Sequence, residues 1–238
     1  AHVTNPNEIF SGANNLLSTN GVFVVEVPHL LNIIKENQYD NIYHEHIGFH
    51  SLKSLVDLAN KNGLTAFKVQ KIDSQGGSLR CFFKKSGCYK LKTDKSIQLN
   101  LAYEKRSKLF DKNNLKKYKL KINNHRKNFL EFLKKLKKSK KKISVYGASG
   151  RGQSLLQFSN IGNKIIDTAY DKSKMKQQRK TPGTYIPVND PKKINRDNID
   201  YLLILSWNLQ KEIIKQESVF RKNGGRFIVP FPTPKIIK

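Results

Sequence analysis

The segment Tyr43-His44-Glu45-His46 places four titratable side chains in four consecutive residues. It offers two imidazoles, a carboxylate and a phenol. A neutral imidazole has a pKa near physiological pH, which suits the removal of a moderately acidic proton. We therefore predict that His46 is a general base, that Glu45 orients its ring, and that Tyr43 assists it.

Two other interpretations of this segment stay open at the level of sequence. In the first, His44, His46 and His50 bind a metal ion together with Glu45, because imidazoles two residues apart point the same way on an extended segment. The spacing matches no established metal motif, however, and no second group of ligands is visible, so we expect no metal. In the second, the segment is simply a polar surface loop.

A second chemical feature is the glycine-rich turn 147–152, with the sequence Gly-Ala-Ser-Gly-Arg-Gly, between a predicted strand and a predicted helix. Glycines let the backbone approach a phosphate, and the N-terminus of the helix attracts an anion. Asp171 ends the next predicted strand, where a dinucleotide site places the acid that binds ribose hydroxyls. Because the glycine order is GxxGxG rather than GxGxxG, tight packing of the helix on the strand explains the turn equally well.

Two further segments place polar side chains where ligands bind. Arg80 begins a strand after the turn-forming cluster 75–78, so its guanidinium could hold a phosphate or sugar oxygen, although an ordinary hairpin is the alternative. Trp207, the only tryptophan, and Asn208 follow the predicted strand 201–205. Open α/β sheets bind ligands at the carboxyl ends of their strands, so we favour a binding site over core packing there.

Hydrophobic periodicity predicts the elements that must position these residues. The first part of the chain is expected to hold a buried strand at 22–27, further strands near 64–72 and 79–85, and helices at about 29–38 and 51–62, the second of them capped by Ser51. A long basic helical region follows over about 95–140, and His125 falls on its apolar stripe, which predicts a partly buried helix histidine. From Ile143 onward, predicted strands at 143–146, 164–170, 201–205 and 226–229 alternate with predicted helices at about 151–160 and 208–222. This alternation predicts a parallel sheet covered on both faces.

Composition narrows the class of protein. The 238 residues suffice for two domains. There is no apolar run of about 18 residues and no secretory signal, so we expect no membrane partner and a cytoplasmic location. Cys81 and Cys88 are the only cysteines and lie too far apart for a CxxC pair, so we expect no zinc finger within the chain and two free thiols.

The charge is strongly positive, at +27. Residues 104–142 hold 17 Lys and Arg against 3 Asp and Glu, so about half of the excess lies in the basic helical region. Groove-reading proteins lean on Arg, whereas here Lys outnumbers Arg 37 to 8. We therefore expect a solvated face and no specific nucleic-acid partner, with a general attraction for anions that suits a phosphorylated substrate.

Together these motifs resemble the S-adenosylmethionine-dependent sugar C-methyltransferases, which act on nucleotide-linked keto-sugars. The matching segments follow the family's order over nearly the whole chain; they are 42–46, 76–80, 146–152, 155–156, 181–187, 200–208 and 224–230. The resemblance implies an α/β fold, in which a partial class I methyltransferase sheet precedes a Rossmann-like parallel-sheet domain and a long basic helical region joins them. Residues 1–90 would be the C-terminal half of the methyltransferase domain, 91–142 the helical connector and 143–238 the Rossmann-like domain.

The resemblance also implies a missing upstream part. The family's Cys-rich zinc module and the glycine loop that holds S-adenosylmethionine would both precede residue 1, so zinc is expected only there. The chain starts at Ala1 and its only methionine is Met175, which agrees with a fragment. Activity is therefore expected to require the missing N-terminal part.

The mechanism that the resemblance implies starts at the keto group, which acidifies a neighbouring sugar C–H. His46 takes this proton and the resulting enolate attacks the methyl carbon of S-adenosylmethionine. Tyr43 and Glu45 would position the base or stabilise the enolate oxygen, and His2 would line the same cleft. The nucleotide-sugar would be held by Arg80, Ala148, Ser149, Arg151, Trp207 and Asn208.

Three positions depart from the family pattern, and three other functions stay open. The family usually has Lys at Arg151, and often Tyr at Phe49 and His at Gln75, which bears on substrate specificity more than on reaction class. The glycine turn with Asp171 would also suit an NAD-binding oxidoreductase. A nucleotide-sugar-binding domain without catalysis is a further alternative, and a basic nucleic-acid binder rests on the net charge alone.

Overall fold

The computed structural model describes residues 1–237, which divide into two compact units. The N-terminal unit contains Ala1–Glu36 and His44–Tyr118. The C-terminal unit contains Asn37–Tyr43 and the chain from Lys119 onward. The chain therefore passes from one unit to the other inside the motif of residues 43–46.

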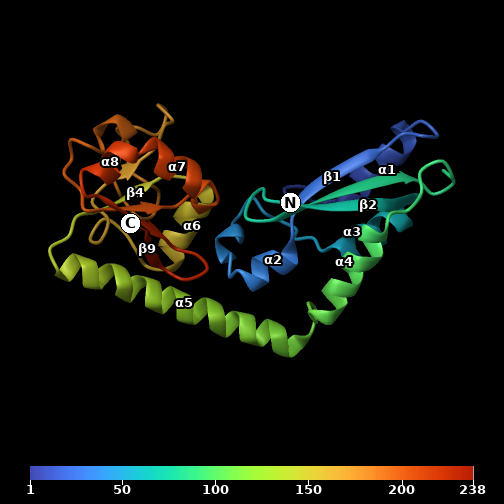
Figure 1. Cartoon of the computed structure of the whole chain (residues 1–238), viewed down its shortest axis with the longest axis horizontal. Coiled ribbons are helices and arrows are strands. Elements are labelled where there is room, and N and C mark those ends of the chain that lie inside the picture. Colours follow the sequence, from blue (N-terminus) through green and yellow to red (C-terminus); the bar gives the residue numbers. More distant parts are fainter. Residues whose placement is uncertain (238) are drawn as a thin grey trace. The chain divides into compact units, whose positions relative to one another are not determined.

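The N-terminal unit is built on a three-stranded antiparallel sheet in the order β1-β3-β2 (Figure 1). Its strands are β1 Phe23–Pro28, β2 Leu64–Ile72 and β3 Ser78–Lys85, and its helices are α1 Pro6–Leu16, α2 Leu30–Lys35, α3 Leu52–Lys61 and α4 Lys95–Arg106. Ser51 caps α3 by accepting a hydrogen bond from the Ser54 amide at 3.1 Å, as the sequence predicts. Asn37 ends the turn after α2 in the left-handed region (φ 57°), so this helix is shorter than predicted.

The prediction of a buried strand at 22–27 is right in position but wrong in burial. Val24 is exposed on β1, whereas Val27 is buried. Within residues 1–237, β1 hydrogen-bonds to β3 alone, so it is an edge strand with one covered face. A run of apolar residues indicates burial on both faces only when both faces are covered, and here they are not.

The C-terminal unit holds a six-stranded sheet in the order β6-β5-β4-β7-β8-β9. The strands are β4 Ile143–Tyr146, β5 Ala169–Tyr170, β6 Val188–Asn189, β7 Tyr201–Ile204, β8 Arg226–Val229 and β9 Lys235–Ile237. All are parallel except β9. This is the doubly wound order, with its switch point between β4 and β7, and it confirms the predicted Rossmann-like sheet.

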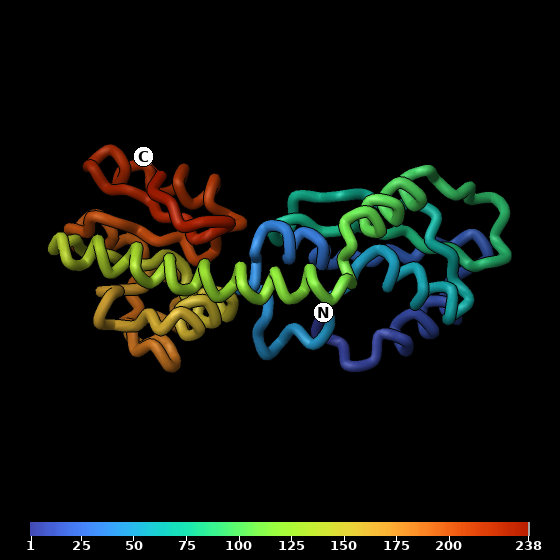
Figure 2. Tube along the Cα trace, turned by 90° about the horizontal axis from the view of Figure 1, so that it is seen from below, coloured from blue at the N-terminus to red at the C-terminus, as the bar shows by residue number. Residues whose placement is uncertain are grey.

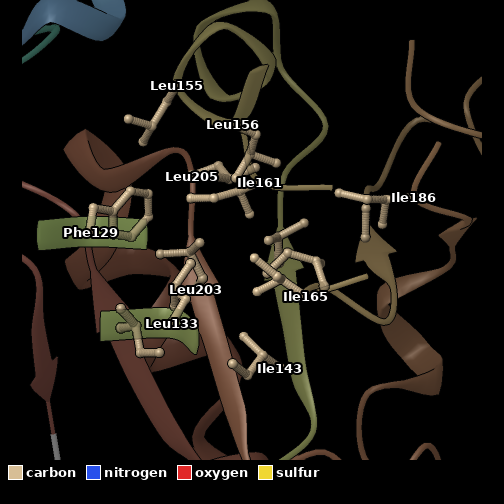
Figure 3. Close-up of a cluster of buried hydrophobic side chains, with 14 of the residues drawn as sticks. Phe129, Leu133, Ile143, Leu155, Leu156, Ile161, Ile165, Ile186, Leu203 and Leu205 are labelled. Atoms are coloured by element: carbon tan, nitrogen blue, oxygen red, sulfur yellow. The ribbon is translucent and has the colours of Figure 1, made fainter. Parts of the chain in front are cut away.

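Helices cover both faces of this sheet, as predicted. They are α5 Lys112–Lys138, α6 Gly150–Phe158, α7 Gln210–Gln216 and α8 Ser218–Lys222, with the 3₁₀ turns η1 Tyr39–Asn41, η2 Pro191–Lys193 and η3 Trp207–Leu209. On one face, Phe129 and Leu133 of α5 and Leu155 of α6 pack against Leu203 of β7 (Figure 3). On the other face, Phe220 of α8 joins a second cluster. Figure 2 shows the C-terminal part of α5 lying beside the strands of this unit.

Two predicted elements of this unit are shorter than expected. The strand predicted at 164–170 is reduced to Ala169–Tyr170, since Ile165 and Ile166 are buried in a turn rather than in a strand. The helix predicted at 208–222 is divided into η3, α7 and α8. In both cases the apolar pattern reports burial correctly, but burial alone does not specify the backbone conformation.

Two side-chain predictions are confirmed. His125 is buried on α5, and Cys81 and Cys88 are both free and buried. Burial raises the pKa of the Cys81 thiol to about 12. Over residues 1–237, no helix has both the length and the apolar character needed to cross a bilayer.

Candidate functional site

The N-terminal unit brings two of the predicted catalytic residues together. The amides of Ile47 and Gly48 donate to the Ala1 carbonyl at 2.7 and 3.2 Å, which fixes the start of the chain beside the end of the motif. As a result, the rings of His2 and His46 lie 5.2 Å apart between centroids. Two histidines that are 44 residues apart in the sequence thus lie close together in the fold, as a shared cleft would require.

The remaining motif residues of this unit are exposed. His44 and Glu45 have 84% and 55% of their side-chain surface exposed, and Nε2 of His44 lies 4.0 Å from Oε1 of Glu45. Among residues 1–237, no three His, Cys, Asp or Glu side chains are grouped to hold a metal ion. The role of Glu45 in orienting His46 stays a prediction.

Tyr43 belongs to the C-terminal unit. Its ring lies against the first turn of α6, because a Cβ added at Gly150 would be 3.3 Å from Cε2 of Tyr43. The phenol ring therefore lies beside the glycine-rich turn 147–152. This contact explains why a side chain at position 150 would be crowded.

The buried carboxylate of Glu104 holds together the two segments that flank the motif in sequence, one at His29 and the other at Leu52 and Lys53. Glu104 Oε1 accepts hydrogen bonds from the Leu52 amide at 2.6 Å and lies 2.8 Å from Nε2 of His29, while Oε2 accepts from the Lys53 amide at 3.0 Å. The Leu30 amide also donates to the His50 carbonyl at 3.0 Å. Burial of Glu104 favours its neutral form, but these hydrogen bonds outweigh that effect and lower its pKa.

The glycine-rich turn lies at the carboxyl end of β4, next to the switch point of the sheet. Gly147 has φ 91°, and a Cβ there would be 2.8 Å from Oγ of Ser206. Gly152 packs on the end of β7, where a Cβ would be 2.7 Å from Cβ of Leu205. Ser149 caps α6 by accepting from the Gly152 amide at 3.2 Å. Tight packing thus accounts for part of the glycine pattern, and the turn still occupies the position where this fold binds ligands.

Asp171 is already engaged within this turn. Its Oδ2 accepts from the Ala148 amide at 2.7 Å and its Oδ1 from the Ser173 amide at 2.8 Å. Lys176 lies 3.3 Å from Oδ2 and also donates to the Ala148 carbonyl at 3.0 Å. A ribose would have to displace these partners, which counts against the NAD-binding interpretation.

Trp207 and Arg151 converge on a residue that the sequence did not single out, Asp40. Oδ2 of Asp40 accepts from Nε1 of Trp207 at 2.8 Å and from Nε of Arg151 at 3.1 Å, and Nη2 of Arg151 lies 2.9 Å away. The Arg151 guanidinium also lies over the indole, 5.3 Å from its centroid. Asn208 is half-buried in the same 3₁₀ turn as Trp207. Asp40 carried no sequence signal, since a polar run such as 37–41 is typical of an exposed loop, yet all five residues are buried.

Burial favours the neutral form of Asp40 and raises its pKa, although the nearby Arg151 charge and the Trp207 hydrogen bond act in the opposite direction. Oδ1 of Asp40 has no hydrogen-bond partner among the described residues.

A second network of buried hydrogen bonds joins His125 to Tyr39, the residue that precedes Asp40 in the sequence. Nε2 of His125 lies 2.7 Å from the Pro230 carbonyl, which only accepts, so this nitrogen carries a proton. Nδ1 of His125 lies 2.9 Å from the Tyr39 hydroxyl. Burial lowers the pKa of His125, so the neutral ring accepts from Tyr39 at Nδ1. Tyr39 also packs edge-on against Phe231 at 5.3 Å.

Arg80 lies in the N-terminal unit, whereas Ala148, Ser149, Arg151, Trp207 and Asn208 lie in the C-terminal unit. On β3, Nε and Nη2 of Arg80 donate to Oε2 of Glu26 at 3.0 and 2.8 Å. The pair is exposed on both sides. Its role in substrate binding stays a prediction.

Comparisons with known proteins identify the family of this chain. A family model described as the C-methyltransferase C-terminal domain matches residues 73–232. C-methyltransferase NovU of Streptomyces niveus is 33% identical to this chain over 237 residues, covering 100% of this chain and 56% of NovU. The chain thus spans about half the length of this curated relative. On this match and this identity, the chain belongs to the C-methyltransferase family that carries this C-terminal domain.

Proposed function

We propose that this chain supplies the general base and the nucleotide-sugar site of a C-methyltransferase. The complete enzyme would transfer a methyl group from S-adenosylmethionine to a carbon next to the keto group of a nucleotide-linked deoxy-sugar. The observation that carries the proposal is the meeting of His2 and His46, with centroids 5.2 Å apart, in a chain of this family. Proton removal from carbon needs a base at a fixed position, and the contact with the His2 ring supports such a position for His46.

In this mechanism the neutral ring of His46 takes the proton from the carbon beside the keto group. The electron pair of that C–H bond moves onto the carbonyl oxygen and forms an enolate. Tyr43 is the proposed hydrogen-bond donor to this oxygen, and Glu45 the proposed partner of the base. His2 would line the same cleft, where its imidazole limits the ring positions open to His46.

The nucleotide part of the substrate would bind at the carboxyl ends of β4 and β7. Doubly wound sheets bind ligands at their switch point, and here the turn 147–152 and the 3₁₀ turn with Trp207 and Asn208 flank it. The proposed contacts in the C-terminal unit are Ala148, Ser149, Arg151, Trp207 and Asn208. Arg80 of the N-terminal unit is a separate proposed substrate contact. The high net charge of +27 favours a phosphorylated ligand of this kind.

S-adenosylmethionine would supply the electrophilic methyl group, and its site is not assigned to residues of this chain. The glycine-rich strand-to-helix turn of the chain lies in the C-terminal unit, and its Ala148 amide is bound to Asp171. We propose that residues 1–90 are the C-terminal half of a methyltransferase domain. The open edge of β1 and the exposed Val22, Val24 and Ile9 nearby support this, because such an edge pairs readily with another strand.

The test is the substitution His46→Ala in the complete enzyme. Methyl transfer should fall by about 10²- to 10⁴-fold, the usual contribution of a general base. Exchange of the acidic sugar proton with deuterated water, followed by NMR without S-adenosylmethionine, should fall by the same factor. His44→Ala is the matched control, since this exposed neighbour should leave both rates within about threefold.

Two results would contradict the assignment. Undiminished exchange and transfer in His46→Ala would remove His46 as the base. An equal loss in His44→Ala would favour the metal-binding interpretation instead.

A nucleotide-sugar-binding domain without catalysis is the second candidate, and a specific observation favours it: the switch-point site of the C-terminal unit lies entirely within this chain. Calorimetric titration with a nucleoside diphosphate sugar would show binding by this chain. If the complete protein also binds this ligand but shows neither proton exchange nor methyl transfer, this second function is the correct one.

A further inference from the structure

We propose that Asp40 is a positioning residue that holds Trp207 and Arg151 in their binding orientation and fixes the segment leading into the motif onto the C-terminal unit. The positioning of Trp207 and Arg151 is a claim about this chain alone. Only its consequence for substrate affinity rests on the proposed function. Asp40 precedes Tyr43 by three residues, so the segment that this carboxylate holds leads directly into the motif.

The segment Asn37–Tyr43 packs into the C-terminal unit although its neighbours in sequence belong to the other. Tyr39 inserts its ring among Phe231, Phe158 and His125, at centroid distances of 5.3 to 5.4 Å. This apolar contact holds the segment, but it leaves the rotation of the following residues open. The polar contact through Asp40 removes that freedom, since η1 places Asp40 directly after Tyr39.

Asp40 is only 1% exposed, so water does not compete for its bound oxygen. The indole N–H of Trp207 is a donor with no acceptor function, and it meets Oδ2 at 2.8 Å. Arg151 approaches the same oxygen with two nitrogens and stacks over the indole. Each of the three side chains therefore contacts the other two, and the removal of one leaves the other two without a shared partner.

Charge makes Asp40 the central member of this set. The Arg151 side chain is 13% exposed, and it would be a largely buried cation without the carboxylate. If Asp40 were neutral, Arg151 would gain by turning toward water, and Trp207 would lose the group stacked on its face. Both predicted substrate contacts would then change orientation together, which a purely local packing role would not produce.

The first experiment uses the chain as it is and needs no substrate. Trp207 is the only tryptophan, so its fluorescence reports this site alone. Asp40→Asn should shift the emission to longer wavelength and raise the iodide quenching constant about twofold or more, since the indole loses its charged partner. Hydrogen exchange of residues 37–43, measured by mass spectrometry, should become faster. Glu131→Gln, which removes an exposed carboxylate from α5 of the same unit, should change none of these signals.

The second experiment measures coupling. Asp40→Asn and Arg151→Gln should be strongly non-additive in the quenching constant, because each removes the same ion pair. If Asp40→Asn does not fold, Trp207→Phe serves in its place. This variant keeps an aromatic ring but lacks the N–H, and it should still accelerate exchange in 37–43.

In the complete enzyme, Asp40→Asn should raise KM for the nucleotide-sugar about tenfold and change kcat less than about threefold, as expected for lost binding rather than lost chemistry. Wild-type fluorescence, quenching and exchange in Asp40→Asn would overturn the positioning role. If the complete enzyme transfers no methyl group even as wild type, the proposed function fails, while the fluorescence and exchange results still decide the role of Asp40.

Discussion

Two buried carboxylates, one in each unit, hold the chain around the motif of residues 43–46, and their surroundings differ. Glu104 of the N-terminal unit is bound at both oxygens, by His29 and by the amides of Leu52 and Lys53. Asp40 of the C-terminal unit is bound at Oδ2 alone, by Trp207 and Arg151. Within the described residues its Oδ1 has no partner.

The pKa shifts of the two carboxylates also differ in sign. Burial favours the neutral form of both groups. For Glu104, donors to both oxygens outweigh burial and the pKa falls. For Asp40, burial outweighs the Arg151 charge and the Trp207 hydrogen bond, and the pKa rises. The comparison teaches that donors lower the pKa of a buried carboxylate only where their combined effect outweighs its desolvation.

The largest effect on stability is expected from Glu104→Ala. It leaves the buried His29 ring and two backbone amides without their acceptor, which typically costs about 3–5 kcal/mol. Native-state hydrogen exchange at Leu52 and Lys53 would measure the loss directly. Protection within about 1 kcal/mol of wild type at both amides would show that Glu104 does not hold the segments at His29 and at Leu52 and Lys53 together.

A smaller effect on the free energy of unfolding is expected when the pH is varied, and its sign differs between Glu104 and Asp40. The folded pKa of Glu104 lies below its ordinary 4.5, so its contribution is fully present above pH 4.5 and is lost as the pH falls through the folded pKa. The folded pKa of Asp40 lies above its ordinary 3.8, so the folded state binds this proton more tightly. Stability therefore decreases as the pH rises from 3.8 through the folded pKa.

Denaturant titrations between about pH 3 and pH 7 test this contrast. The stability difference between wild type and Glu104→Gln should grow with pH. The difference between wild type and Asp40→Asn, followed through Trp207, should shrink with pH. If both stability differences changed with pH in the same direction, the opposite pKa shifts of Glu104 and Asp40 would be contradicted.

The smallest effect is expected from Glu26→Ala, which breaks the exposed pair with Arg80. Exposed pairs contribute about 0.2–1 kcal/mol, because water solvates both partners when the pair is broken. The same denaturant titration measures it, and it sets the baseline against which Glu104→Ala is judged. A loss as large as that of Glu104→Ala would mean that burial is not what separates the two pairs.

Much of the fold was predictable from local pattern. Alternating strands and helices after Ile143 correctly predict the doubly wound sheet, and Ser51 correctly predicts the start of α3. The long helical region was predicted without its interruption between α4 and α5. Asp111 carried the missing signal, since its side chain accepts from the amides of Asn113 and Asn114 at the start of α5.

The candidate site was predictable only in its motifs. Tyr43, His46, the turn 147–152 and Trp207 stand out because their types and spacing are unusual in a short window. Asp40 and Glu104 do not stand out, because an isolated acid looks the same whether it is exposed or buried. Their importance depends on partners that no short window contains.

By itself, then, the sequence determined the approximate positions of most strands and helices, the presence of a parallel sheet covered by helices and the identity of the motifs, since these follow from periodicity and from short-range contacts. The tertiary structure alone decided that residues 37–43 pack with the C-terminal unit, that β1 is half exposed, and that Asp40 and Glu104 are buried against their donors. The physical reason is distance along the chain. Asp40 meets Trp207 across 167 positions and Glu104 meets Leu52 across 52, so only the folded chain brings these charges to their donors.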